Sequence, residues 1–391
     1  MKGSRPLTGN DARVKILFAS YRDYYPDRVD GAILSAHGLL EMLMGRGHAC
    51  EAVVGVDGRK RLRVLAYRLR RMATARRVPA WPDLRSGYPT YRAWEQLIPS
   101  LIEQRIQRWR PDVIVTQLEG SERVVGIAAA ARVPVIQYAV DSEMVWEPHA
   151  NSQSDWLMYM SISRFVAERA RARLNVLTPV IYPIIHVERY RSAARDPRHI
   201  TFITPAREKG LDVAIEVARL LPHRPFLFQR TWPIPDDALR ALLARLAPLR
   251  NVTLGETTIQ MSDVYAKTRL LLMPSQWEEG FGRVAIEAQA NGIPVVASAI
   301  GGIPEAVGQG GVLLPATSPP NEWAEAIEGV LGDPAMHDRL SRDALANTQR
   351  VELKPDVIAE RFLEIARAHI EHCLSAHGAD RTPDQRSGRL A

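Results

Sequence analysis

The most informative stretch of the chain is LLLMPSQWEEGFGRVAIEAQANGIPVVASAIGGIPEAVGQGGVLLP, residues 270–315. Its first apolar run, residues 270–273, is short enough for a buried strand. Residues 283–291 contain no helix breaker, and a glycine and a proline follow them, as expected just beyond a helix end. Residues 293–297 form the next apolar run. The stretch therefore predicts a strand, a loop, a helix and a second strand.

The loop of this unit carries glycines and carboxylates in an order that suits a nucleotide. Gly280 and Gly282 let the backbone approach a ligand closely, and free N–H groups at the following helix start favour an anion such as a diphosphate. Glu287, one turn into that helix, is placed to accept hydrogen bonds from two ribose hydroxyls. Glu279 precedes the glycines and is placed to reach a hydroxyl beyond the phosphates. The pattern thus predicts a site for a ribose, a diphosphate and a sugar.

The longer pattern resembles family 4 glycosyltransferases, the retaining enzymes that use nucleotide-diphosphate sugars. The resemblance rests on Glu279 and Glu287 at the two ends of EGFGRVAIE, followed by NGIPVVAS and GGIPEAV. It covers residues 14–370 and is strongest in the second half. It implies the GT-B fold: two Rossmann-like, doubly wound α/β domains facing a cleft, with the donor held by the second domain and the acceptor by the first.

The chain as a whole agrees with that plan, because strands alternate with helices throughout and 391 residues suit two domains. In the first domain we expect, among other elements, a helix over residues 91–109. From the N-terminus onward we expect a flexible tail at 1–13, an acceptor-side domain at 14–190, a nucleotide-sugar-binding domain at 191–354, a terminal helix crossing back to the first domain at 355–375, and a disordered tail at 376–391.

The resemblance also implies roles for single residues. Lys209 would stabilise the leaving diphosphate and Glu279 would hold the donor sugar, so these two are the catalytic candidates. The donor-binding candidates flank the same loop or face it: Gly31, Arg207, Gly280, Phe281, Gly282, Arg283, Val284 and Glu287. Asp141 and His149 are candidates on the acceptor side. Purely structural alternatives remain: a turn glycine at Gly31, a solvated Lys209 and a surface His149 without a role.

Two positions depart from the family pattern. Many members have a histidine where this chain has Val140, and an arginine where it has Thr204. Arg207, three residues later, either replaces that arginine or points to solvent. These departures favour a second hypothesis, a relative that binds a nucleotide sugar without transferring it and acts as a partner subunit.

We expect neither a cofactor nor a metal, since the family needs no metal and the nucleotide sugar is a co-substrate. No Asp-x-Asp follows a strand to carry a cation. Cys50 and Cys373 lie far apart, which gives no metal spacing and no disulfide framework and favours a reducing compartment.

The net charge of +7 favours an anionic partner, but no nucleic-acid recognition motif is present, so we expect no nucleic acid. Residues 58–78, GRKRLRVLAYRLRRMATARRV, interleave apolar side chains with nine basic ones. This segment is either an amphipathic helix on an anionic membrane or a solvated helix or acceptor-side loop.

No apolar run approaches about 18 residues, and the N-terminus lacks the apolar core of a secretory signal. We therefore expect a cytoplasmic protein, with peripheral contact at the inner membrane face through residues 58–78 as an alternative. The sequence does not specify the base, the sugar, the oligomeric state or the acceptor, which is a lipid, a polysaccharide or a small natural product.

Overall fold

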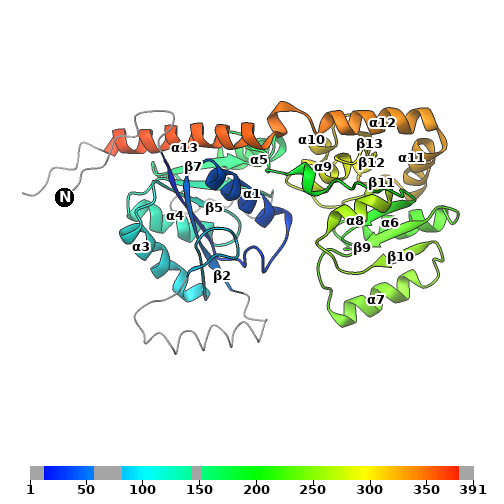
Figure 1. The fold of residues 1–391 in the computed structure, drawn as a ribbon, viewed down its shortest axis with the longest axis horizontal. Helices are drawn as coiled ribbons and strands as arrows, with labels where there is room; N and C mark the ends of the chain where they lie inside the picture. Colours follow the sequence, from blue (N-terminus) through cyan, green and yellow to red (C-terminus); the bar gives the residue numbers. More distant parts are fainter. Residues whose placement is uncertain (1–12, 57–81, 142–151, 378–391) are drawn as a thin grey trace, which may run out of the picture.

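The computed structural model describes residues 13–56, 82–141 and 152–377, which form two α/β domains (Figure 1). The sheet of the first domain contains β1 (Lys15–Ser20), β2 (Ala49–Gly55), β3 (Pro82–Asp83), β4 (Thr90–Ala93), β5 (Val113–Thr116), β6 (Val135–Ala139) and β7 (Leu157–Ser161). Its order within the described residues is β3-β4-β2-β1-β5-β6-β7, and the strands pair in parallel except that β3 is antiparallel to β4.

The sheet of the second domain is parallel throughout. It contains β8 (His199–Ile203), β9 (Phe226–Gln229), β10 (Val252–Gly255), β11 (Thr268–Met273), β12 (Val295–Ser298) and β13 (Gly311–Leu314). Its order, again within the described residues, is β10-β9-β8-β11-β12-β13. The order reverses between β8 and β11, and ligands of doubly wound sheets bind at the carboxyl ends of the strands beside such a reversal.

Within the described residues, helices connect most of the successive parallel strands in both domains, as parallel sheets require. The first domain has α1 (Gly31–Gly45), α3 (Ile98–Arg108), α4 (Ser121–Ala130) and α5 (Arg164–Leu174). The second has α6 (Leu211–Leu220), α7 (Asp236–Leu246), α8 (Met261–Lys267), α9 (Arg283–Gln289), α10 (Ile303–Val307), α11 (Pro320–Gly332) and α12 (Pro334–Asn347). The expected pair of doubly wound domains facing a cleft is thereby confirmed.

Burial explains why residues 270–273 of β11 are all apolar. Leu270, Leu271 and Leu272 of β11 are all fully buried, because helices cover both faces of the parallel sheet. The loop that follows β11 leaves the sheet at its carboxyl edge and ends at Gly282, directly before α9. The glycines and carboxylates predicted to bind a ligand therefore lie beside the strand-order reversal.

The last helix, α13 (Pro355–His377), returns from the second domain and runs along the first (Figure 1). Its 23 residues span about 35 Å. Near its start Glu360 accepts from Arg46 at 2.8 Å, and further along His369 Nε2 lies 3.1 Å from the carbonyl oxygen of Trp156. The helix thus connects the end of the second domain to elements of the first.

Two details of the secondary structure differ from the expectations. The predicted helix over residues 91–109 is wrong at its start: residues 90–93 pair in parallel with β2 as β4, and α3 begins only at Ile98. Pro99 lies in the first turn of α3, where a proline is tolerated, but an earlier helix start would place it in the interior. The short β13, which pairs with β12, was not predicted as a strand.

Candidate functional site

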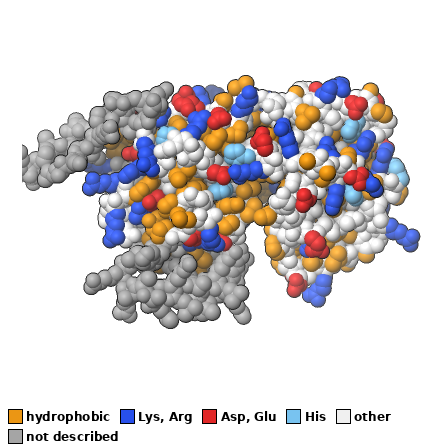
Figure 2. All heavy atoms as spheres, in the orientation of Figure 1, with side chains coloured by type: hydrophobic (Ala, Val, Ile, Leu, Met, Phe, Trp, Pro, Cys, Tyr) orange, Lys and Arg blue, Asp and Glu red, His pale blue; other side chains and the backbone are white. Residues whose placement is uncertain are grey.

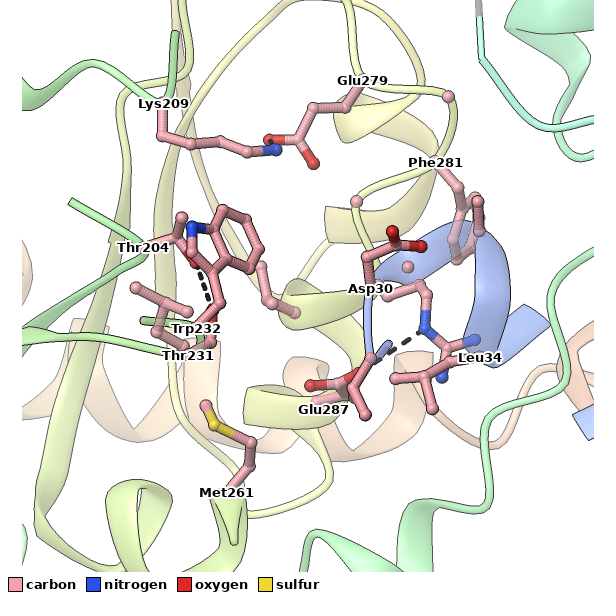
Figure 3. A pocket seen from close by; sticks show the side chains of 18 of the residues that line it. Asp30, Leu34, Thr204, Lys209, Thr231, Trp232, Met261, Glu279, Phe281 and Glu287 are labelled. Carbon is pink, nitrogen blue, oxygen red and sulfur yellow. Dashed lines mark hydrogen bonds and ion pairs between the residues drawn. The ribbon is translucent and has the colours of Figure 1, made fainter. Parts of the chain in front are cut away.

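A cleft of about 980 Å³ lies between the two domains. Its walls come from segments that follow the carboxyl ends of strands in both sheets. It brings together ten of the twelve predicted site residues: Gly31, Asp141, Lys209, Glu279, Gly280, Phe281, Gly282, Arg283, Val284 and Glu287. Figure 3 shows Lys209 and Glu279 together at one end of the cleft and Glu287 at the other.

Lys209 and Glu279, the two catalytic candidates, form an ion pair. Lys209 Nζ lies 3.0 Å from Glu279 Oε1, and the two side chains are 29% and 14% exposed. Ser275 Oγ donates to the same carboxylate oxygen at 3.1 Å. Lys209 enters from the turn before α6, and Glu279 from the loop after β11. The pair places a cation and a hydrogen-bond acceptor side by side at the strand-order reversal.

Glu287 projects from α9 and is buried in the cleft wall, with 4% of its surface exposed. The hydroxyl of Tyr265 on α8 donates to Glu287 Oε2 at 3.0 Å. Burial raises the pKa of this carboxyl, while the nearby Arg283 and hydrogen bonds from Tyr265 and Tyr190 act in the opposite direction. The two tyrosines fix the orientation of the carboxylate that is predicted to hold the ribose.

Arg283 reaches from the second domain across to the first. Its guanidinium donates to the carbonyl oxygen of Ile184 at 3.2 Å and to Ser35 Oγ on α1 at 3.4 Å. Its Nε lies 3.7 Å from Glu287 Oε1 and has no hydrogen-bond partner among the described residues. Gly31, at the start of α1, lies against its stem: a Cβ there would come 3.5 Å from Arg283 Cδ. Arg283 is therefore shared between the domains.

The glycine loop closes against the first domain at one backbone contact. A Cβ on Gly280 would lie 2.1 Å from the carbonyl oxygen of Val140, so only glycine fits at this position. Nearby, the carboxylate of Glu305 on α10 accepts from the N–H of Arg164 at 2.9 Å and from the hydroxyl of Tyr182. Val140, at the position where a histidine was expected, thus contacts the loop through its backbone.

One predicted site residue that the structure describes is not brought to the cleft. Arg207 is exposed and lines a separate depression beside Glu208 and Gln276, so the structure does not support the expectation that it joins the donor site. The cause is local: hydrogen bonds from Lys209 N to Ala206 O and from Gly210 N to Arg207 O form a tight turn that points it outward. His149 and residues 58–78 lie outside the described residues.

Aromatic residues of the site were not found from the sequence. Tyr265 and Tyr190 bind Glu287, and Trp232 and the stacked pair Tyr25 and His37, 4.0 Å apart, line the cleft. No motif contains them. The only available signal was their position just after a strand or at a helix, which they share with many core aromatics.

Among the described residues, no group of three or more His, Cys, Asp or Glu side chains is arranged to hold a metal ion. None of the described helices combines the length and the apolar character needed to cross a membrane. On the face shown in Figure 2, basic and acidic side chains are interspersed over both domains.

Comparison with known proteins agrees with this geometry. Residues 197–333 match the family model described as "Glycosyl transferases group 1". The chain is 31% identical over 235 residues to a D-inositol 3-phosphate glycosyltransferase of Streptomyces bingchenggensis, covering 52% of this chain and 50% of the relative. A relative of the same description from Streptomyces avermitilis is 34% identical over 252 residues, covering 56% and 52%. The chain spans about half the length of these relatives.

Solved structures show the same fold over nearly the whole chain. A glycosyltransferase from Rickettsia africae has a TM-score of 0.70 at 16% identity, covering 92% of this chain and 99% of that one. HepE of Anabaena, solved in complex with UDP and glucose, has a TM-score of 0.67 at 18% identity, covering 91% and 100%. The second domain of the chain thus resembles the group 1 glycosyltransferases, and the chain has the two-domain GT-B fold of these structures.

Proposed function

We propose that this protein is a retaining, metal-independent glycosyltransferase that moves a sugar from a nucleotide-diphosphate sugar to an acceptor hydroxyl. The observation that carries the proposal is the Lys209–Glu279 ion pair at one end of an interdomain cleft whose other end holds Glu287. Together they span a site for a sugar, a diphosphate and a ribose. The family match and the UDP-bound structures of similar fold support the same class of donor.

In the proposed reaction the bond between the sugar C1 and the diphosphate oxygen breaks, and a bond from C1 to the acceptor oxygen forms. The acceptor proton passes to the leaving diphosphate. Lys209 stabilises the negative charge that develops on that diphosphate, and Glu279 accepts hydrogen bonds from the sugar. Glu287 holds the ribose, since a buried carboxylate fixed by tyrosines is an acceptor of defined direction.

The experiment that tests the proposal is turnover of a donor panel, beginning with UDP-glucose, in the presence of lipid, polysaccharide and small polyol acceptors, inositol phosphate among them. We expect transfer to persist in excess chelator. We also expect the product to keep the anomeric configuration of the donor, as measured by NMR. Transfer with inverted configuration or loss of activity in chelator would contradict the mechanism.

A second function, nucleotide-sugar binding without transfer, is favoured by one observation: Arg207 lies outside the cleft, and Thr204 stands at the end of β8. Calorimetry and turnover distinguish the two functions. The partner-subunit role would be favoured if the protein binds a nucleotide sugar but neither transfers the sugar to any acceptor nor hydrolyses the donor.

A cytoplasmic location and membrane contact through residues 58–78 stay predictions. Vesicle sedimentation with anionic lipid at low salt tests the membrane contact. Absence of the protein from the pellet would contradict it.

A further inference from the structure

Two large apolar side chains of the second domain line the cleft and are exposed. Trp232 and Ile259 line it, yet they are 41% and 70% exposed. Trp232 follows β9, and Ile259 follows the neighbouring strand β10. An exposed tryptophan and isoleucine cost free energy in water, so their place inside a concave site indicates an apolar part of the ligand that covers them.

The loops that carry them are tied together. The N–H of Thr258 donates to the carbonyl oxygen of Arg230 at 3.3 Å, and Arg230 Nε donates to the carbonyl oxygen of Gly255 at 3.0 Å. On the other side, the hydroxyls of Thr231 and Thr204 lie 2.8 Å apart, which connects the Trp232 loop to the end of β8. Trp232 therefore stands on a loop that is hydrogen-bonded to segments of both neighbouring strands.

The surroundings and chemistry of Trp232 indicate which part of a nucleotide sugar lies against it. Figure 3 shows its ring on the Thr204 side of the cleft, between Lys209 and Met261 and across from Asp30 and Phe281. The charged groups proposed for the diphosphate and sugar are Lys209 and Glu279, and the one for the ribose is Glu287. An uncharged indole face, in a cleft that Met261 and Ile259 also line, matches none of these polar parts. It matches a flat, weakly polar ring.

We propose that Trp232 is the platform on which the nucleobase of the donor stacks, with Ile259 as a second exposed apolar side chain of the same cleft. The proposal rests on the proposed function, because it assigns a residue to that same donor site. Stacking on an indole uses the π-face that every base has, so Trp232 contributes affinity and not a choice between bases. Trp232 is uncharged and takes no part in the chemical step.

Calorimetric titration of UDP, GDP and ADP into wild type, Trp232→Ala and Trp232→Phe tests this role. Trp232→Ala weakens every nucleoside diphosphate that wild type binds, by about tenfold. Trp232→Phe keeps an aromatic face, although it loses the five-membered ring of the indole with its N–H, so its affinity stays within about threefold of wild type. The control Trp109→Phe, in the first domain where Lys15 lies over the ring at 5.5 Å, leaves all affinities unchanged.

Tryptophan fluorescence gives a second readout that does not depend on the alanine variant. Nucleotide binding quenches the emission of wild type, and Trp232→Phe loses most of that quench although calorimetry shows that it still binds. The exposed position of Trp232 predicts an unchanged midpoint of thermal unfolding without ligand in both variants.

Three outcomes would overturn the inference. If Trp232→Ala binds nucleotides within twofold of wild type, nothing stacks on it. If Trp232→Phe loses as much affinity as Trp232→Ala, an aromatic face at this position does not hold the nucleotide and the contact is not stacking. If wild type binds no nucleoside diphosphate, the proposed function fails and this inference fails with it, whereas the first two outcomes leave the proposed function standing.

Discussion

The hydroxyl of Tyr265 donates a hydrogen bond to Glu287 Oε2 over 3.0 Å and so joins α8 to α9 beneath the cleft. Tyr265 is fully buried and is not part of the cleft lining, so it reaches a ligand only through Glu287. A carboxylate buried to this degree is stable only if its oxygens are hydrogen-bonded. Tyr265 is therefore a positioning residue for the proposed ribose site.

Tyr265→Phe is expected to weaken nucleotide binding several-fold and to lower the free energy of unfolding by about 2 kcal/mol, the usual contribution of a hydrogen bond to a charged group. Calorimetry with a nucleoside diphosphate and denaturant unfolding measure the two effects. Tyr24→Phe is the matched control, because it removes a buried hydrogen bond to Tyr88 in the first domain. Equal loss of nucleotide affinity in both variants would contradict a specific role for Tyr265.

Glu287→Gln removes the charge of Glu287 and keeps the size and shape of the side chain. Alanine is a poorer test, because it would also leave the buried hydroxyl of Tyr265 without its hydrogen-bond acceptor. We expect glutamine to weaken nucleotide binding about tenfold, since it loses the charge-assisted hydrogen bonds to the ribose. Nucleotide affinity equal to that of wild type would remove Glu287 from the ribose site.

The same variant has an expected pH dependence. Burial raises the pKa of Glu287, so the folded protein holds this proton more tightly than the unfolded chain. The stability that the carboxyl contributes is present at low pH and is lost as pH rises through the raised pKa. The free energy of unfolding of Glu287→Gln, measured relative to wild type, should therefore increase with pH from about 4.5 upward. A flat difference across that range would contradict the assigned shift.

Lys209→Ala should reduce transfer by about a hundredfold or more, because removing one donor that stabilises a developing charge has effects of that size. Its partner Glu279 keeps the hydrogen bond from Ser275 and is partly solvated, so the folded state should change little. Lys267→Ala, at the exposed end of α8, is the control of the same chemistry. Transfer by Lys209→Ala at the wild-type rate would identify Lys209 as a structural lysine.

Much of this arrangement could be predicted from local sequence rules, and there is a physical reason why the rest could not. The unit of β11, its loop, α9 and β12 is predictable because continuous apolar runs and a breaker-free helix alternate within 46 residues. The placement of its loop residues in the cleft is also predictable, because the loops that follow parallel strands meet at one edge of the sheet.

What the sequence could not predict depends on contacts between distant segments. The pairing of Lys209 with Glu279 joins positions far apart in the chain, and the outward direction of Arg207 results from one turn. Tyr265 and Trp232 carry no motif, since burial and exposure of an aromatic side chain are decided only by packing. The start of α3 was mistaken because pairing of residues 90–93 with β2 overrides their helical pattern.

His37 predicts an acid-sensitive first domain. It stacks on Tyr25, and its Nδ1 lies 2.9 Å from the Tyr88 hydroxyl. Burial lowers the pKa of His37 to about 4; the charge of Glu41 raises this pKa and the charge of Arg189 lowers it further. Because the folded-state pKa of His37 is depressed, the stability it contributes is present above about pH 6.5 and is lost as pH falls through 4.

The difference between these two pKa values corresponds to on the order of 3 kcal/mol. His37→Gln keeps a hydrogen-bonding side chain without a titration in this range, so its unfolding free energy should fall less between pH 6.5 and 4 than that of wild type. His372→Gln, on the exposed side of α13, is the control. Identical pH profiles for His37→Gln and wild type would show that other groups cause the acid sensitivity.

Gly280→Ala tests whether contact between the domains is needed for transfer but not for donor binding. The added Cβ would lie 2.1 Å from the carbonyl oxygen of Val140 in the first domain, so the two backbones must move apart. The donor groups Lys209 and Glu287 belong to the second domain and keep their own partners there. We expect nucleotide affinity to stay within about threefold of wild type and transfer to fall more than tenfold, since a misplacement of about 1 Å is sufficient for a large loss of rate.

Calorimetry, turnover and the radius of gyration from X-ray scattering measure the three consequences of Gly280→Ala. Gly329→Ala is the matched control, because a Cβ on that helical glycine meets no atom within 4 Å and should stabilise α11 slightly. If Gly280→Ala transfers sugar at the wild-type rate, the contact with Val140 is dispensable and the reacting groups of the two domains meet by another approach. If it loses nucleotide binding and transfer together, the loop itself, and not the contact between the domains, depends on this glycine.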